Sequence, residues 1–275
     1  MNAGDVSLRA RQVGRKTDDS KALDHAVRVG LIAYGIVHLL IAWVAIQLAF
    51  GDRSGSASSD GALSAMARTP MGGVLLYVVA AGFGALVLWQ LTEALTGHRD
   101  KEGKKRVMKR LGSGLKVILY GSLGWSALKI AIGSGSDGGN TDTMTAKIMS
   151  MPAGQLLVGA AGLAVLGYGI RLIYRGLSES FMDKLQTEGQ VGDTGKAFLW
   201  LGKAGYVSKG LALFVVAGLF LWAAWTHDPK KSGGLDQALQ TVLEQPFGMP
   251  MLLALGAGIA CYGLFAFAWA RHLDR

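Results

Sequence analysis

The sequence has little of what soluble enzymes and secreted domains are built from. It contains one cysteine, Cys261, and only 17% of its 275 residues are charged. A single cysteine excludes an internal disulfide and any metal site made of several cysteines. No P-loop, no His-Glu-x-x-His motif and no paired cysteines occur. The loops between apolar runs have fewer than 35 residues, too few for an independent catalytic domain. We therefore expect no enzymatic activity and no cofactor.

Long apolar runs are what the sequence does contain. Hydrophobic residues make up 51% of the chain, and six stretches of about 20 residues are long enough to cross a bilayer as helices. They are residues 29–50, 72–96, 112–132, 154–177, 205–226 and 249–270. The basic segment before the first stretch is too long for a signal peptide, which indicates an uncleaved anchor. We predict an all-α membrane protein with six transmembrane helices.

The positive charge is distributed unevenly between the two ends of these helices. Of the 28 Lys and Arg residues, 20 lie in the N-terminal segment, in residues 97–111 and 171–204, and at the C-terminus. Basic residues favour the cytoplasmic side, so both termini are expected there. Topology and attraction to anionic headgroups then explain the net charge of +9. We expect anionic membrane lipids as partners and no nucleic acid.

The chain repeats itself three times. A shift of 82 residues superposes the second copy on the first, and a shift of 175 to 176 residues superposes the third. The predicted units are residues 28–100, 110–182 and 203–275, preceded by a basic segment at 1–27. Each unit holds two spans, so all three run in the same direction, which predicts pseudo-threefold symmetry. Many carriers have inverted repeats instead.

Each unit carries the same connecting element between its two spans. The shared residues are Asp60 and Pro70, Asp142 and Pro152, and Asp236 and Pro246. Asp is expected to N-cap a short helix in the outer membrane interface. Pro then ends that helix, and Pro-x-Gly opens the second span. The element is interpreted either as a structural lid or as a mobile gate over a cavity.

The beginning of each unit carries a glycine-rich pattern. The three copies read Gly205-Tyr206-Val207-Ser208-Lys209-Gly210, Gly30-Leu31-Ile32-Ala33-Tyr34-Gly35 and Gly112-Ser113-Gly114-Leu115-Lys116-Val117. With three two-helix units, the chain resembles the domain of unknown function 1206 family, found mainly in actinobacteria. The resemblance implies a multi-pass protein of the bacterial plasma membrane. It implies no particular activity.

Polar residues inside the spans are the candidate site. Tyr34, Lys116 and Lys209 occupy equivalent positions about one turn inside the cytoplasmic boundary. They either extend toward the headgroups or form a ring around the symmetry axis that binds a lipid headgroup or anion. Glu93 lies near the cytoplasmic end of its span, where an ion pair and a proton or cation site are the alternatives. His38 is the only histidine deep in a span, so packing is favoured over haem binding.

Two classes of function are consistent with these features. The first is a non-enzymatic accessory or structural subunit that binds lipid or a protein partner in the membrane. The second is a channel or carrier for a small solute or anion along the pseudo-threefold axis. Glycines in the second spans favour close helix packing and a compact bundle. A centre filled with side chains would favour the first class, and a continuous polar cavity the second.

Overall fold

The computed structural model describes residues 21–52, 58–95, 103–133 and 141–272, and this part of the chain is helical. The long helices are α2 (Lys21–Ala49), α4 (Gly72–Leu95), α5 (Gly103–Ala131), α7 (Gly154–Leu177), α8 (Gly192–Thr226) and α10 (Gly248–Arg271). The short helices are α3 (Ser59–Ala67), α6 (Thr141–Met149) and α9 (Leu235–Leu243), with 3-10 turns η1 (Met182–Lys184), η2 (Thr187–Gly189) and η3 (Pro229–Lys231).

Five of the described helices are long and apolar enough to cross a membrane, and the protein is a multi-pass membrane protein. These segments are Val27–Ala49, Gly72–Leu95, Gly154–Leu177, Gly192–Thr226 and Gly248–Arg271, with mean hydropathies of 1.9 to 2.3. Their outer surfaces carry large exposed apolar side chains, such as Trp225 at 86% exposure, as expected of residues that face lipid. The predicted span at 112–132 lies in α5, where Lys116, Lys129 and several serines lower the hydropathy. Six spans are therefore not confirmed.

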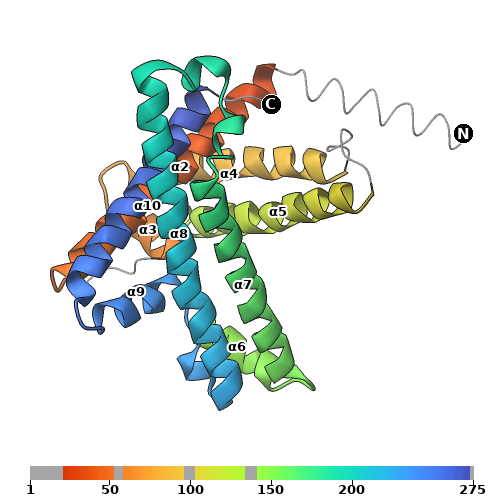
Figure 1. Ribbon diagram of the computed structural model, residues 1–275, viewed down its shortest axis with the longest axis vertical. Helices are drawn as coiled ribbons and strands as arrows, with labels where there is room; N and C mark the ends of the chain where they lie inside the picture. Colours follow the sequence, from red (N-terminus) through yellow and green to blue (C-terminus); the bar gives the residue numbers. More distant parts are fainter. Residues whose placement is uncertain (1–20, 53–57, 96–102, 134–140, 273–275) are drawn as a thin grey trace, which may run out of the picture.

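The helices pack most extensively in three pairs, α4 with α5, α7 with α8, and α10 with α2. Figure 1 shows that the α4–α5 pair runs in a clearly different direction from the α7–α8 pair. The first two pairs join the end of one repeat to the start of the next, and α10 with α2 joins the last repeat to the first. Contacts within a repeat are fewer, between α8 and α10 and between α2 and α4.

Glycines let two of these pairs approach closely at equivalent positions of the repeat. A methyl group added at Gly35 in α2 would lie 2.9 Å from the carbonyl oxygen of Gly263 in α10. One added at Gly210 in α8 would lie 2.8 Å from the carbonyl oxygen of Gly169 in α7. Both distances are below ordinary van der Waals contact, so a larger residue would force the helices apart.

The Pro-x-Gly element opens the second long helix of every unit, as predicted. Its glycine is the first residue of α4, α7 and α10. In each unit the glycine N–H donates to the carbonyl three residues earlier, at 2.8 to 2.9 Å. A methyl group on Gly72, Gly154 or Gly248 would collide with a carbonyl at the end of the preceding short helix. The recurring glycine therefore allows each short helix to end directly against the next long one.

The prediction that the aspartates N-cap the short helices is wrong for two of them. Ser58 caps α3, where its hydroxyl accepts from the Gly61 N–H at 3.0 Å. Gly234 precedes α9 and provides no side-chain cap. Asp60 and Asp236 instead lie at the second helical position, and Asp142 holds the same position in α6. At that position a carboxylate stabilises the helix by interacting with the positive end of the helix dipole, but it does not cap the helix.

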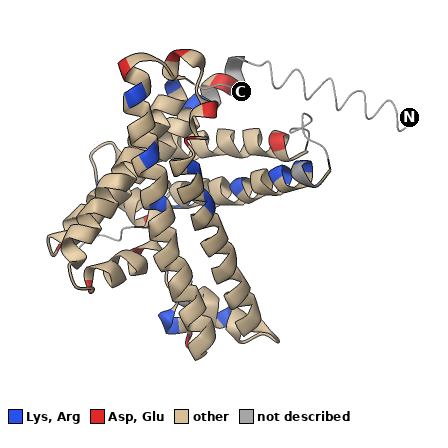
Figure 2. Ribbon diagram, in the orientation of Figure 1, with Lys and Arg blue, Asp and Glu red and all other residues tan. Residues whose placement is uncertain are grey.

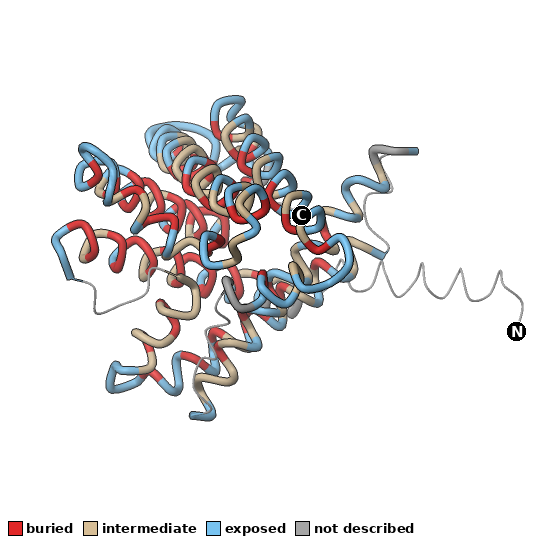
Figure 3. The backbone as a smooth tube through the Cα atoms, turned by 90° about the horizontal axis from the view of Figure 1, so that it is seen from below, coloured by how far each residue is buried: buried red, intermediate tan, exposed pale blue. Residues whose placement is uncertain are grey.

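Buried, exposed and basic residues occupy different parts of the bundle. Figure 3 shows buried residues along the inner sides of the helices and exposed residues on the outer rim. The main core cluster takes buried residues from all six long helices and from α3. Figure 2 shows Lys and Arg gathered where the upper ends of α7, α8 and α10 meet, and along α5. A smaller basic group lies at the opposite end.

Candidate functional site: a buried lysine, histidine and tyrosine cluster

A lysine from one long helix meets a histidine and a tyrosine of another at the centre of the bundle. The Lys209 Nζ in α8 donates to the Tyr34 hydroxyl in α2 at 2.6 Å. The same Nζ lies 2.9 Å from the His38 Nε2, one turn further along α2. Tyr34 and His38 are only 5% and 8% exposed. The three side chains therefore form one polar cluster in an otherwise apolar interior.

The hydrogen bonds assign the proton on the His38 ring. The His38 Nδ1 lies 2.8 Å from the backbone carbonyl oxygen of Tyr34. A carbonyl oxygen only accepts, so Nδ1 carries the hydrogen and Nε2 is left as an acceptor. Lys209 then donates to two neutral acceptors, His38 and Tyr34. The three hydrogen bonds are consistent with one another, because each one pairs a donor with an atom that can accept.

Two tyrosine rings complete the surroundings of the Lys209 ammonium. Its Nζ lies 4.3 Å from the ring centre of Tyr262 in α10 and 5.0 Å from that of Tyr34. The face of Tyr262 attracts a cation at this distance, whereas Nζ approaches Tyr34 from the hydroxyl edge of its ring. No carboxylate of the described residues pairs with Lys209. Neutral groups alone thus surround a cation, which leaves the cluster able to attract an anion.

Small residues hold α2, α8 and α10 close enough for this cluster to form. A methyl group at Gly205 in α8 would lie 2.6 Å from the Tyr262 Cα, so Gly205 brings α8 against α10 at the cluster. Gly258 in α10 makes room for the Ser208 side chain in the same way. Gly35 and Gly263 bring α2 against α10. The glycine pattern at the start of the first and third units therefore has a packing role.

Aromatic rings fill the space around the cluster. Tyr34 makes edge contacts with Phe83 of α4, at 6.5 Å between ring centres, and with Tyr120 of α5, at 5.7 Å. Tyr206 of α8 packs edge-on against Tyr262 at 5.1 Å. Phe83, Tyr120 and Tyr206 are all buried. At the level of the cluster, the centre is occupied by side chains from five helices.

The structure brings together some of the predicted site residues and separates others. Tyr34 and Lys209 meet, which matches the ring and not the extension toward the headgroups for these two residues, and His38 joins them. Lys116 does not. Together with Glu93 it belongs to a second group near the C-terminal ends of α4 and α7 and the middle of α5, where Arg175 and Arg171 also act electrostatically on Lys116. The predicted ring of three equivalent side chains is therefore incomplete.

Two features of the site were not predicted from the sequence as part of it. Tyr262 packs on the Lys209 ammonium, and its repeat equivalent is Tyr168, so the recurring Tyr-Gly pair was an available signal. Arg175 places its guanidinium 5.5 Å from the ring centre of Tyr206. Nothing in the repeat indicates that contact, because the residues equivalent to Arg175 are Glu93 and Trp269. No group of three or more metal-ligating side chains occurs among the described residues.

These features define a class, the multi-pass helical membrane proteins made of tandem two-helix units. Within it, the chain belongs to the family described as Domain of Unknown Function (DUF1206), whose model matches residues 29–97, 111–179 and 204–272. The three matches fall inside the three predicted units. The chain is also 28% identical over 247 residues to the Uncharacterized protein YxxB of Bacillus subtilis (strain 168). The aligned region covers 87% of each of the two proteins. No solved structure matches the chain.

Proposed function

We propose that this protein is a non-enzymatic plasma-membrane protein that binds anionic lipid and serves as an accessory or structural subunit. The observation that carries the proposal is the filled centre. Lys209, His38 and Tyr34 satisfy one another, and buried aromatic rings surround them. Such an arrangement stabilises one packing of the helices and offers no reactive group to a substrate.

In this proposal α5 is the sixth membrane helix. It has 29 residues, enough to cross a bilayer, and it packs along α4, which is itself a candidate span. Large apolar side chains of α5 face outward, among them Leu115, Ile118 and Trp125. Lys129 lies in the last turn, where a long side chain can extend to the headgroups.

The proposed arrangement is a ring of three units with pseudo-threefold symmetry. It is supported by the pairing of each unit's second helix with the next unit's first, including α10 with α2. The equivalent close approaches at Gly35 and Gly210 support it as well. In this arrangement both termini are cytoplasmic, and the basic end of the bundle meets the anionic inner leaflet.

A flux measurement in vesicles tests this proposal. The full chain would be reconstituted into vesicles that are loaded with pH-sensitive and chloride-sensitive dyes. We expect proton and chloride flux at the level of protein-free vesicles, with and without a membrane potential. Flux well above that level that is lost in Lys209→Met would contradict the accessory role.

Transport of a small anion is the second candidate, and one observation favours it. Ionisable residues inside a membrane usually have functional roles, and Lys209 has no carboxylate partner among the described residues. A transported anion would supply the missing counter-charge. In that case, small anions should compete for flux, and the centre would have to open between Tyr34 and Tyr262.

A further inference from the structure

We infer that a single anionic phospholipid binds at the second repeat, with one acyl chain in a groove between α4 and α5 and its phosphate on Lys116, Arg171 and Arg175. The inference rests on the proposed lipid binding and assigns it a lipid class and a site. The argument has three parts, the groove, its basic end and the missing helix contact beside it.

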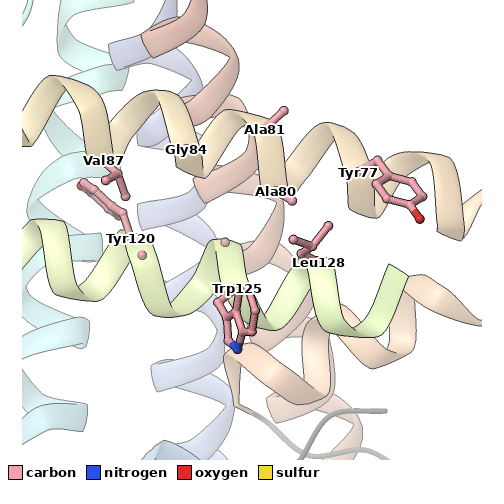
Figure 4. Close-up of a pocket in the computed structure, with 10 residues that line it drawn as sticks. Tyr77, Ala80, Ala81, Gly84, Val87, Tyr120, Trp125 and Leu128 are labelled. Carbon is pink, nitrogen blue, oxygen red and sulfur yellow. The ribbon is translucent and has the colours of Figure 1, made fainter. Parts of the chain in front are cut away.

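The groove lies along the α4–α5 pair (Figure 4). Its volume is about 480 Å³. The lining side chains are almost entirely apolar, and they are Tyr77, Ala80, Ala81, Gly84 and Val87 from α4 and Tyr120, Gly121, Gly124, Trp125 and Leu128 from α5. Tyr77 and Trp125 are at least half exposed, so the groove opens toward the outside of the bundle. In a membrane, that surface faces acyl chains.

Glycines create the groove. A methyl group at Gly84 would have no neighbour within 4 Å, and one at Gly121 only Val87 at 3.9 Å. At Gly124 it would lie 3.1 Å from the Phe83 Cβ, which is where the two helices touch. The helices are thus in contact at Gly124 and leave an unfilled channel beside Gly84. An acyl chain fills such a channel without hydrogen bonds.

A cluster of basic residues stands at one end of this groove. Lys116 is four residues before Tyr120, so it lies on the same face of α5, one turn beyond the groove. Arg175, Glu93, Arg171 and Lys109 are close enough to act electrostatically on Lys116. Four basic side chains and one acidic one leave a net positive charge. This charge attracts the phosphate of an anionic lipid whose chain occupies the groove.

Arg175 carries an unused hydrogen-bond donor at this place. Its Nε is buried and has no acceptor among the described residues. The Nε atoms of Arg28 and Arg110 are in the same situation elsewhere in the structure, and leaving any buried donor without an acceptor costs free energy. A phosphate oxygen supplies one, and arginine binds phosphate with two parallel hydrogen bonds. The guanidinium is meanwhile held against the Tyr206 ring.

The second repeat lacks a helix contact that the other two have. A methyl group at Gly30 would lie 2.5 Å from the carbonyl oxygen of Gly82, and one at Gly205 2.6 Å from Tyr262. At the equivalent Gly112 it would meet nothing within 4 Å. Helices α5 and α7 also lack the extensive contact that α2 makes with α4 and α8 with α10. At this place the second repeat is therefore not closed by a helix contact of the kind that the other two repeats have.

Lipid-dependent thermal stability of the full chain tests the inference. The purified protein in neutral detergent is titrated with palmitoyl-oleoyl phosphatidylglycerol or with phosphatidylcholine of the same chains, and unfolding is followed by tryptophan fluorescence. We expect saturable stabilisation by phosphatidylglycerol alone. The apparent affinity should fall about fivefold for each charge removed in Lys116→Gln and Arg171→Gln. Gly84→Leu, which fills the groove, should reduce it at least tenfold.

Matched variants make the outcomes distinguishable. Lys196→Gln removes an exposed lysine outside the cluster, and Gly218→Leu fills open space on α8. Neither should change the affinity. If phosphatidylglycerol stabilises all variants equally, the site is elsewhere, which overturns this inference and leaves the proposed lipid binding intact. If the two lipids act alike on the wild type, both fail. If Gly84→Leu has no effect, or changes only the oligomeric state, the groove is not an acyl-chain site.

Discussion

Replacing Lys209 with methionine should change stability little, because the favourable contacts of its ammonium and the cost of burying it nearly cancel. Methionine has a similar length but no charge. Lys209 makes two hydrogen bonds, at 2.6 and 2.9 Å, and a contact with the Tyr262 ring at 4.3 Å. Hydrogen bonds to a charged group contribute about 1.5–3 kcal/mol each, and the ring contact about 1–2 kcal/mol. Removing the ammonium from water costs several kcal/mol. These contributions nearly cancel.

Lys209→Met should therefore change the free energy of unfolding by no more than about 2 kcal/mol in either direction. Tyr34→Phe removes one acceptor and leaves the ammonium buried, so it should destabilise by about 1.5–3 kcal/mol. In the double variant there is no ammonium to leave unsatisfied. The effect of Tyr34→Phe should therefore be largely lost in the Lys209→Met background.

The assay is a double-mutant cycle in detergent, with unfolding by sodium dodecyl sulfate followed by tryptophan fluorescence. We expect a coupling free energy of about 1.5–3 kcal/mol between Lys209 and Tyr34. Gly73→Ala serves as a control for handling and purification, because a methyl group there meets nothing within 4 Å. Additive effects, with coupling below about 0.5 kcal/mol, would refute the account of the cluster.

Three further predictions concern packing and charge. Gly154→Ala should destabilise by at least about 1–3 kcal/mol in detergent unfolding, because its methyl group would collide with the Ile148 carbonyl oxygen; an effect as small as that of Gly73→Ala would contradict this. Gly30→Ala should cost a similar amount, whereas Gly112→Ala should be neutral or stabilising; equal losses would mean that the second repeat is closed. The Lys203–Glu179 ion pair, 3.0 Å long and 32% and 45% exposed, should contribute at most about 1 kcal/mol, and raising the salt concentration should reduce the effect of Lys203→Gln on the melting temperature.

The repeat made much of this fold predictable. Equivalent residues in three copies indicated the short connecting helices and the Pro-x-Gly starts of α4, α7 and α10, and they left the meeting of Tyr34 with Lys209 as one of two alternatives. These features depend on local sequence or on positions that recur. The N-cap of α3 was not predicted, because Ser58 and Asp60 are both good capping residues and only the backbone geometry selects between them.

The separation of Lys116 from the central cluster could not be predicted from the sequence. Its position in the repeat is the same as that of Lys209, and the difference lies in how the neighbouring helices pack. Gly205 is held against α10, while Gly112 has no such neighbour. That difference arises from tertiary contacts that the repeat does not predict, such as the contact of Arg175 with the Tyr206 ring in the second and third units.

The lipid that the protein retains after purification tests the central claim most directly. Native mass spectrometry of the wild-type chain, extracted from its membrane in a mild neutral detergent, would identify bound lipid by mass. We predict a major species with one anionic phospholipid, which survives activation energies that remove zwitterionic lipid. A protein that emerges without lipid, or that retains zwitterionic lipid equally well, would contradict the account.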